Sequence, residues 1–191
     1  MKIIVTVNNY GKDAVSRYKS WYILADSTMT NTGKPFYIPD FIGEISVSLG
    51  VAIRITRLGK HIDTKFASRY FSEYAPALHF WSPELEKKLK TKNLPADASR
   101  NFDRSLFVGD FKQITDFKPL DLFKNGECIT DFNIHRLLLP IEKVIEDFSV
   151  INTLKMGDII LPGLSEGVRI GEGDVLEVSS DGNKEFHVKI K

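Results

Sequence analysis

The chain has little of three things that would place a protein in a narrow class at once. It has one cysteine, Cys128, so no disulfide can form within it and nothing indicates a disulfide-stabilised secreted scaffold. Its 26 basic and 25 acidic residues leave a formal net charge of +1, so no overall field steers it toward nucleic acid or an anionic membrane. No window approaches the roughly 20 apolar residues of a membrane span. We therefore expect no nucleic-acid partner and no membrane association.

The N-terminal residues give no sign of export. Residues 1–7 are apolar over too short a stretch for the core of a signal peptide, and no small-residue cleavage pattern follows them. They are typical of a first β-strand. The expected location is therefore the cytoplasm.

The overall composition is that of an ordinary globular protein. Apolar residues make up 42% and charged residues 27% of the 191 residues, enough for a hydrophobic core. No repeat, low-complexity tract or linker interrupts the chain, so residues 1–191 are predicted to form a single domain. Cys128 follows the turn-forming pair Asn125-Gly126, and its expected role is that of a half-buried small side chain.

The clearest pattern is a strict alternation of side chains from Ile45 to Ile55. Branched apolar residues occupy every second position, and Ser46, Ser48 and Gly50 fall between them. A period of two over this length predicts one long strand with one buried face and one small, polar face.

Three helices and a hairpin are signalled more locally. Asp63 is expected to cap a short helix, and Ser82 followed by Pro83 is typical of the start of a second, whose lysine-rich end is predicted to be solvated. A third helix is predicted to begin at Pro140. Residues 180–183 (Ser-Asp-Gly-Asn) predict a hairpin turn. Together the patterns predict an α+β fold, mainly β, with two or three short helices.

Several short motifs follow one another in a characteristic order. They are Val7-Asn8-Asn9-Tyr10, Pro35-Phe36-Tyr37-Ile38-Pro39-Asp40, the long strand with Gly59-Lys60-His61-Ile62, Asn101-Phe102-Asp103, Val108-Gly109-Asp110-Phe111, and residues 153–174, which include Met156-Gly157-Asp158. In order and spacing the chain resembles the fumarylacetoacetate hydrolase family, specifically its short bacterial members. The resemblance runs from Lys2 to Ile190.

The resemblance carries expectations about fold, chemistry and partners. It implies a mixed β-roll or sandwich that forms a dimer, either with itself or with an active relative. Family members are hydrolases, isomerases or decarboxylases of oxo-acids. They use a divalent ion, usually magnesium, to hold the oxo and carboxylate oxygens of the substrate.

The same resemblance places the metal ligands of the family on residues that do not suit them. A Glu-x-Glu pair on the long strand falls on Ser48 and Gly50, and the third ligand, an aspartate, falls on His79. Magnesium requires hard oxygen ligands, and residues 45–56 contain no acid in any register. The metal site is therefore predicted to be lost and no cofactor is expected. Mg²⁺ or Mn²⁺ is expected only if the ligands lie elsewhere in the chain.

Other working positions of the family are also replaced. The acid–base pair on a lid falls on Asp13 and Ser16, while Arg100 replaces a lysine and Asp103 is retained. A substrate-facing lysine, an arginine and a Thr-Gly-Thr-Pro loop become, in order, Ala25, Pro83 and the loop Pro162-Gly163-Leu164-Ser165.

Three functional interpretations follow from this pattern. The main one is a non-catalytic family member, a pseudoenzyme, that serves as a binding or interaction domain. The second is a metal-independent enzyme or sensor for a small oxo-acid, with candidate pocket residues His79, Arg100, Asp103 and Asp13, of which His79 is expected to be a packed core histidine. The third is an ordinary metal-dependent hydrolase, isomerase or decarboxylase of oxo-acids.

The three interpretations predict different pockets. A pseudoenzyme should have a filled pocket or one without converging polar groups. A metal-independent enzyme or sensor should have an open pocket lined by His79, Arg100 and Asp103. A metal-dependent enzyme must bring three carboxylates to one point.

Overall fold

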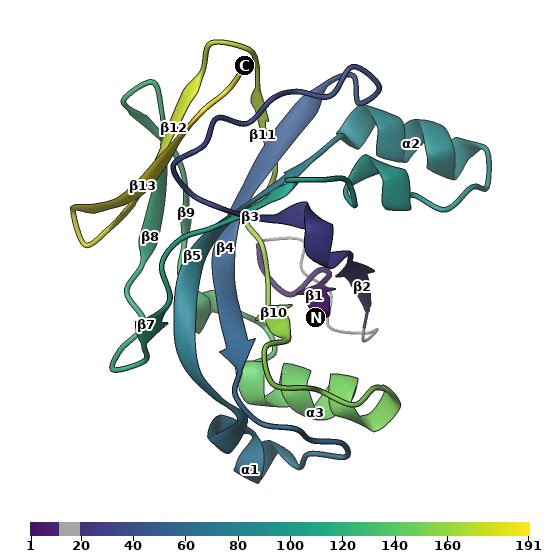
Figure 1. Ribbon diagram of the computed structural model, residues 1–191, viewed down its shortest axis with the longest axis vertical. Helices are drawn as coiled ribbons and strands as arrows, with labels where there is room; N and C mark the ends of the chain where they lie inside the picture. The colour runs from purple at the N-terminus through teal and green to yellow at the C-terminus, as the bar shows by residue number, and fades with distance from the viewer. Residues whose placement is uncertain (12–19) are drawn as a thin grey trace.

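The computed structural model describes residues 1–11 and 20–191, and this part of the chain is mostly β-strand with three α-helices (Figure 1). The predicted fold class, α+β and mainly β, is confirmed. The positions Asp13 and Ser16 lie outside the described residues. The prediction of a single domain over residues 1–191 stays a prediction. The helices are α1 (Thr64–Ala67), α2 (Pro83–Thr91) and α3 (Ile141–Ile151).

The larger sheet of the described chain contains nine strands and is built around two long ones. These are β4 (Ile45–Ile55) and β5 (Phe71–Trp81), which pair antiparallel over almost their whole length. The sheet order is β2-β1-β10-β4-β5-β6-β3, with β11 also paired to β4 and β7 to β5. The other strands are β1 (Ile3–Thr6), β2 (Trp21–Leu24), β3 (Met29–Asn31), β6 (Leu106–Val108), β7 (Lys112–Gln113), β10 (Ile159–Leu161) and β11 (Val168–Ile170).

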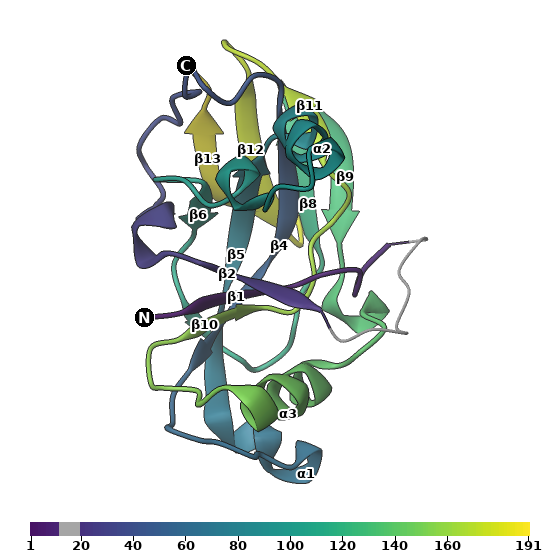
Figure 2. The same ribbon diagram turned by 90° about the vertical axis from the view of Figure 1, so that its right-hand side faces the viewer.

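This sheet curls strongly. Strands β1, β2 and β10 run across the direction of β4 and β5 at a steep angle (Figure 2). The pairs β1–β10 and β3–β6 are parallel and join segments that are far apart in the chain. The curl turns the end of β1 toward the first half of β4 and the C-terminal end of β5, where the cavity described below lies.

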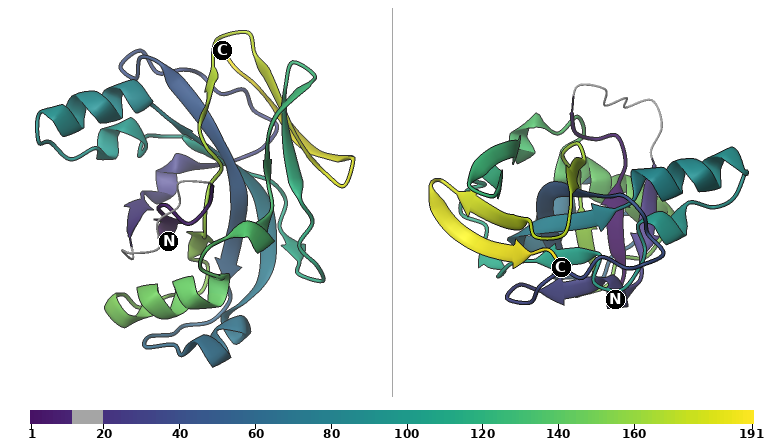
Figure 3. Two further views of the ribbon diagram at one scale, coloured as in Figure 1. Left: turned by 180° about the vertical axis from the view of Figure 1, so that it is seen from behind. Right: turned by 90° about the horizontal axis from the view of Figure 1, so that it is seen from above.

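A second sheet of four strands lies beside β4 and β5 (Figures 1 and 3). The main core forms between the two sheets and α3, where Leu49, Leu122, Phe148 and Val178 are fully buried. Burying each of these side chains stabilises the folded state by roughly 1.5–3 kcal/mol, so packing in this layer holds the two sheets together. The four strands are β8 (Leu120–Lys124), β9 (Glu127–Phe132), β12 (Val175–Ser180) and β13 (Asn183–Lys189).

The long strand is buried on both faces, whereas the sequence predicted one buried face and one small, polar face. Ser46, Ser48 and Ala52 are as buried as the apolar residues between them. The small side chains of this face let Val5 of β1 and Ile159 of β10 pack against it in a second core cluster. The two-residue period in the sequence predicted this strand correctly. Its second face is buried because the sheet curls over it, which the period alone does not indicate.

The local helix and turn signals are confirmed. Asp63 and Ser82 accept backbone N–H bonds from Lys65 and Leu85 as N-caps, and α3 follows Pro140. The hairpin β12–β13 turns at Asp181-Gly182, both with positive φ. Cys128, expected to be half-buried, is exposed because it lies on the edge strand β9.

No helix in the described part of the chain is long and apolar enough to cross a membrane. The compartment stays a prediction.

The loop from Pro162 to Ser165 is held against β4 like an extra strand. Ser165 donates its backbone N–H to the Leu49 carbonyl at 2.7 Å, and its hydroxyl accepts the Leu49 N–H at 2.9 Å. Asn9 fixes the start of the loop, because its side-chain amide donates to the Pro162 carbonyl at 2.7 Å. Gly50 makes this contact possible, since a Cβ there would lie 2.7 Å from the Gly163 carbonyl oxygen.

Replacing Gly50 with alanine should therefore destabilise the protein. The methyl group meets backbone, which cannot swing aside as a flexible side chain would, and such overpacking costs about 1–3 kcal/mol. Chemical denaturation followed by circular dichroism measures the change. Gly171→Ala is the matched control, because nothing lies within 4 Å of a Cβ at that position. Equal stability of the two variants would contradict the close packing of the loop on β4.

Candidate functional site

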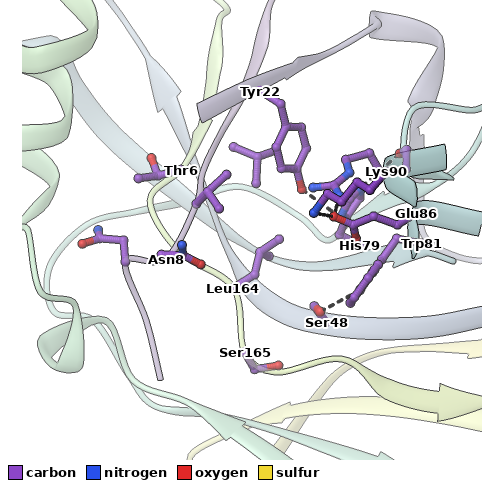
Figure 4. Close-up of a pocket in the computed structure, with 14 residues that line it drawn as sticks. Thr6, Asn8, Tyr22, Ser48, His79, Trp81, Glu86, Lys90, Leu164 and Ser165 are labelled. Carbon is purple, nitrogen blue, oxygen red and sulfur yellow. Dashed lines mark hydrogen bonds and ion pairs between the residues drawn. The ribbon is translucent and has the colours of Figure 1, made fainter. Parts of the chain in front are cut away.

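A cavity of about 330 Å³ opens between the end of β1, the first half of β4, the C-terminal end of β5 and one face of α2 (Figure 4). Polar side chains from separate elements converge on it: Tyr22 of β2, Ser48 and His79 of the central strands, and Arg100. In Figure 4 Tyr22, His79, Glu86 and Lys90 gather on one side, opposite Thr6 and Asn8. The remaining lining residues are Val5, Val7, Asn9, Trp81, Leu164 and Ser165.

The pairing of β4 with β5 sets the inner wall. Ser48 lies directly opposite His79 in the antiparallel register. The Trp81 indole, two residues further along β5, donates its N–H to the Ser48 hydroxyl at 3.1 Å (Figure 4). Residues two apart on a strand share a face, so His79 and Trp81 are presented to the cavity together.

His79 is held in one tautomer by its partners. Its Nε2 lies 3.1 Å from the Arg100 backbone carbonyl, which can only accept, so Nε2 carries the hydrogen. The Nδ1 lone pair then accepts the Tyr22 hydroxyl over a long 3.4 Å. The Arg100 guanidinium lies over the Tyr22 ring, 4.7 Å from its centroid. These contacts join His79, Tyr22 and Arg100 in one cluster.

Burial keeps the first two groups of this cluster uncharged at neutral pH. Desolvation lowers the pKa of His79 to about 4, since a buried imidazolium loses its hydration. Desolvation raises the pKa of Tyr22 to about 12, although the nearby Arg100 cation opposes the shift. At pH 7 the pair is therefore a neutral hydroxyl donor beside a neutral imidazole.

The charged groups of the cavity form a compact set of three. Glu86 makes ion pairs with both Lys90 and Arg100. The spacing of four residues places Glu86 and Lys90 on the same face of α2. Burial alone would raise the pKa of Glu86, but hydrogen bonds and charge from Lys90 and Arg100 outweigh it and hold that pKa below its usual value.

A second cavity of about 290 Å³ adjoins the first. Asn8, Ser48, Trp81, Leu164 and Ser165 line both, so these residues form the boundary between two compartments. The second compartment is otherwise lined by Tyr10, Gly11, Glu166 and Gly167.

The predicted pocket residues separate into two groups. His79 and Arg100 line the cavity and contact each other, as the metal-independent interpretation requires. Asp103 does not: it is exposed in a turn and is absent from the cavity wall. Asp13 lies outside the described residues. His79 is also packed, at 1% exposure, so it is both a core residue and part of the wall.

Four cavity residues were not recognised from the sequence: Tyr22, Trp81, Glu86 and Lys90. The spacing of Glu86 and Lys90 was visible, but the whole lysine-rich end of α2 was predicted to be solvated. Lys90 is indeed exposed, yet it bends to Glu86 at the mouth of the cavity. Tyr22 carried no signal, because only the curl of the sheet brings β2 beside β5.

The residues on which the resemblance places the metal ligands do not fit a magnesium or manganese ion. Ser48 and His79 lie together, but the serine hydroxyl accepts the Trp81 N–H and both imidazole nitrogens are engaged. Gly50 leaves no space for a side chain, and the residues two positions either side of it on this face are Ser48 and Ala52, neither of which is acidic. Among residues 1–11 and 20–191, no three His, Cys, Asp or Glu side chains converge. Hard divalent ions require several carboxylate oxygens, which this wall lacks.

Comparison with known proteins assigns the class of protein. The family model described as fumarylacetoacetate (FAA) hydrolase C-terminal matches residues 5–190, so the chain belongs to the fumarylacetoacetate hydrolase family. The resemblance seen in the motifs is thereby confirmed.

Named relatives are enzymes that act on oxo-acids. The mitochondrial oxaloacetate tautomerase FAHD1 of Mus musculus is 28% identical over 83% of this chain and 75% of its own. The mitochondrial oxaloacetate decarboxylase of Dictyostelium discoideum is 30% identical over 70% and 64%. A crystal structure of fumarylpyruvate hydrolase from Pseudomonas aeruginosa, in complex with Mn²⁺ and pyruvate, superposes with a TM-score of 0.90 at 18% identity, over 100% of this chain and 89% of that one.

These relatives favour an enzyme over the pseudoenzyme interpretation, for which they offer no support.

The low pKa of His79 predicts how the free energy of unfolding depends on pH. The unfolded chain binds a proton on this histidine below pH 6.5, but the folded chain does so only near pH 4. The unfolded state therefore holds more protons in this window, and the free energy of unfolding falls as the pH falls from 6.5 to 4. His79→Gln should reduce that slope by up to about 1.4 kcal/mol per pH unit, measured by urea denaturation across the window. The exposed His135, replaced in the same way, is the control. An unchanged slope in the His79 variant would contradict a neutral buried imidazole.

Proposed function

We propose that the protein binds a small 2-oxo acid in the 330 Å³ cavity. The observation that carries the proposal is the convergence of Arg100, Lys90 and Tyr22 on one side of this cavity. A guanidinium with an ammonium beside it suits a carboxylate, and a neutral tyrosine hydroxyl suits an oxo oxygen. The substrates in the names of the two curated relatives belong to the same chemical class.

The proposed binding mode uses fixed cations in place of a divalent ion. Ser48 and His79 supply no carboxylate for a metal, whereas Arg100 supplies positive charge that cannot be lost by deprotonation. Arg100 is itself oriented, because its side chain lies over Tyr22 and its carbonyl accepts from His79. A preoriented cation loses little freedom when it meets a ligand.

Keto–enol tautomerisation is the reaction that best suits such a site. One proton leaves the carbon next to the oxo group, one is added to the oxo oxygen, and no bond between heavier atoms breaks. Hydrolysis needs an activated water. The cavity wall offers no metal ligand set to activate one. Tyr22, whose hydroxyl donates to Nδ1 of His79, is the candidate proton donor to the oxygen. The proton from the carbon passes to that Nδ1, and His79 returns it to Tyr22 along their hydrogen bond.

A non-catalytic binding domain is the second candidate. A serine, a glycine and a histidine at the positions where the resemblance places the metal ligands, with Glu86 already paired to two cations, favour it. In that case the cavity binds an oxo-acid without converting it. Measuring oxaloacetate enol by its ultraviolet absorbance, beside a binding assay on the same sample, separates the two candidates.

The first test is the thermal unfolding midpoint with pyruvate, in EDTA and again in millimolar Mg²⁺ or Mn²⁺. A ligand that binds only the folded state raises the midpoint with occupancy. We expect pyruvate to raise it equally with and without the metal. A rise confined to the samples with metal would overturn the metal-free mode and restore the metal-dependent interpretation.

Loss of either cation should weaken binding. Arg100→Gln removes a charge-assisted contact worth roughly 1.5–3 kcal/mol, so the Kd for pyruvate should rise tenfold or more in calorimetric titration. Lys90→Gln should have a smaller effect, since the ammonium is more exposed. Lys88→Gln, an exposed lysine on the same helix and outside the cavity wall, is the matched control. An unchanged Kd in the Arg100 variant would contradict the proposal.

The dimer implied by the family stays a prediction, with a second copy or an active relative as the partner. Several large apolar side chains near α3 are exposed: Leu58, Val150, Ile151 and Met156. Sedimentation equilibrium of the purified chain should give about twice the mass of one chain if the partner is itself. A monomer at all concentrations would leave only a different chain as partner.

A further inference from the structure

The wall of the main cavity carries a net charge of one positive unit. Arg100 and Lys90 contribute two positive charges and Glu86 one negative charge. Of the other titratable lining residues, Tyr22 and His79 are neutral at pH 7, with pKa values of about 12 and about 4. A ligand with one carboxylate therefore neutralises the wall, and one with two carboxylates leaves an unmatched negative charge.

Glu86 lies where its charge can directly repel a second carboxylate of the ligand. Its carboxylate touches both cations, and its side chain, at 16% exposure, is as enclosed as that of Arg100 at 17%. Charges that are partly shielded from water interact more strongly than surface charges. Any ligand carboxylate that reaches Arg100 and Lys90 shares them with Glu86.

The described lining of the adjoining compartment has no positive charge that could pair with a second carboxylate of the ligand. Its only charged lining residue among those described is Glu166, which is acidic. A dicarboxylate that extended its second carboxylate past Trp81 and Leu164 would meet this like charge. Both compartments therefore disfavour a dianion.

We propose that Glu86 determines specificity by charge, so that the cavity accepts 2-oxo acids with one carboxylate and discriminates against 2-oxo dicarboxylates. This inference rests on the proposed oxo-acid binding. It sets the chain apart from the relatives named for oxaloacetate, which carries two carboxylates. Glu86 acts by its charge and its ion pairs; no proton transfer is assigned to it.

The experiment compares two ligands that differ in one group. 2-Oxobutanoate and oxaloacetate have the same carbon skeleton, and a methyl group in the first replaces a carboxylate in the second. Calorimetric titration in EDTA at pH 7.5 gives the Kd for each. The unmodified protein should bind 2-oxobutanoate about tenfold more tightly than oxaloacetate, since one unmatched charge near a protein surface is worth 1 kcal/mol or more.

Glu86→Gln should remove or reverse this preference. The wall then carries two positive charges, so both acids should bind more tightly, and oxaloacetate should gain about tenfold more than 2-oxobutanoate, because it carries the extra carboxylate. The gain should shrink in 0.5 M NaCl, because salt screens charge but not shape. Glu86→Asp keeps the charge and should keep the preference. Glu84→Gln is the matched control: this exposed residue of the same helix accepts the Glu44 N–H outside the cavity.

The outcomes separate this inference from the proposed function. If neither acid binds the unmodified protein, the proposed function fails and the inference with it. If both acids bind and the unmodified protein shows no preference, or if Glu86→Gln shifts both ligands equally, the specificity role is wrong while oxo-acid binding stands. If Glu86→Gln does not fold, the ratio in the unmodified protein and in Glu86→Asp decides: a preference for the monocarboxylate in both supports the role, and its absence overturns it.

Discussion

The antiparallel pairing of β4 with β5 is the interaction on which the rest of the structure depends. Two strands of 11 residues each lie side by side with only one irregularity in register, between Arg54 and Ile55. One face of the pair carries the core shared with the second sheet and α3, and the other carries the small side chains over which β1 and β10 close. A shift of one residue would exchange the two faces, so the burial of both makes the register strongly specified.

That register also builds the site. It sets Ser48 opposite His79 and brings Trp81 onto the same face, so the inner wall of the cavity is part of the most tightly packed region of the chain. The charged groups come from less constrained elements: Glu86 and Lys90 from α2, which buries no residue fully, and Arg100 from the segment after it. One wall of the cavity is therefore rigid and uncharged, and the wall facing it is charged and less constrained. This arrangement suits recognition of a small acid, because each oxygen of the acid can contact a polar group of its own.

The positive charge of this site is supplied differently from that of a metal-dependent enzyme. A divalent ion concentrates two positive charges at one point but requires carboxylates that largely cancel them. Here the resemblance places the ligands on Ser48, Gly50 and the buried, neutral His79, and the positive charge lies on Arg100 and Lys90. The cavity wall is thus cationic, and the Glu86 carboxylate offsets part of that charge.

The sequence by itself determined the family, the fold class and every element with a local cause: the period of two from Ile45 to Ile55, the N-caps Asp63 and Ser82, and the turn at Asp181-Gly182. It also showed that residues 45–56 contain no acid, which follows from composition alone. Only the tertiary structure decided that the second face of β4 is buried, that Tyr22 meets His79, and that Arg100 belongs to the site while Asp103 does not. Tyr22 and His79 are 57 residues apart, His79 and Arg100 are 21 apart, and β10 pairs with β4 from more than 100 residues away. No local pattern encodes these contacts, because they arise from the curl of a sheet whose strands close in an order unlike that of the chain.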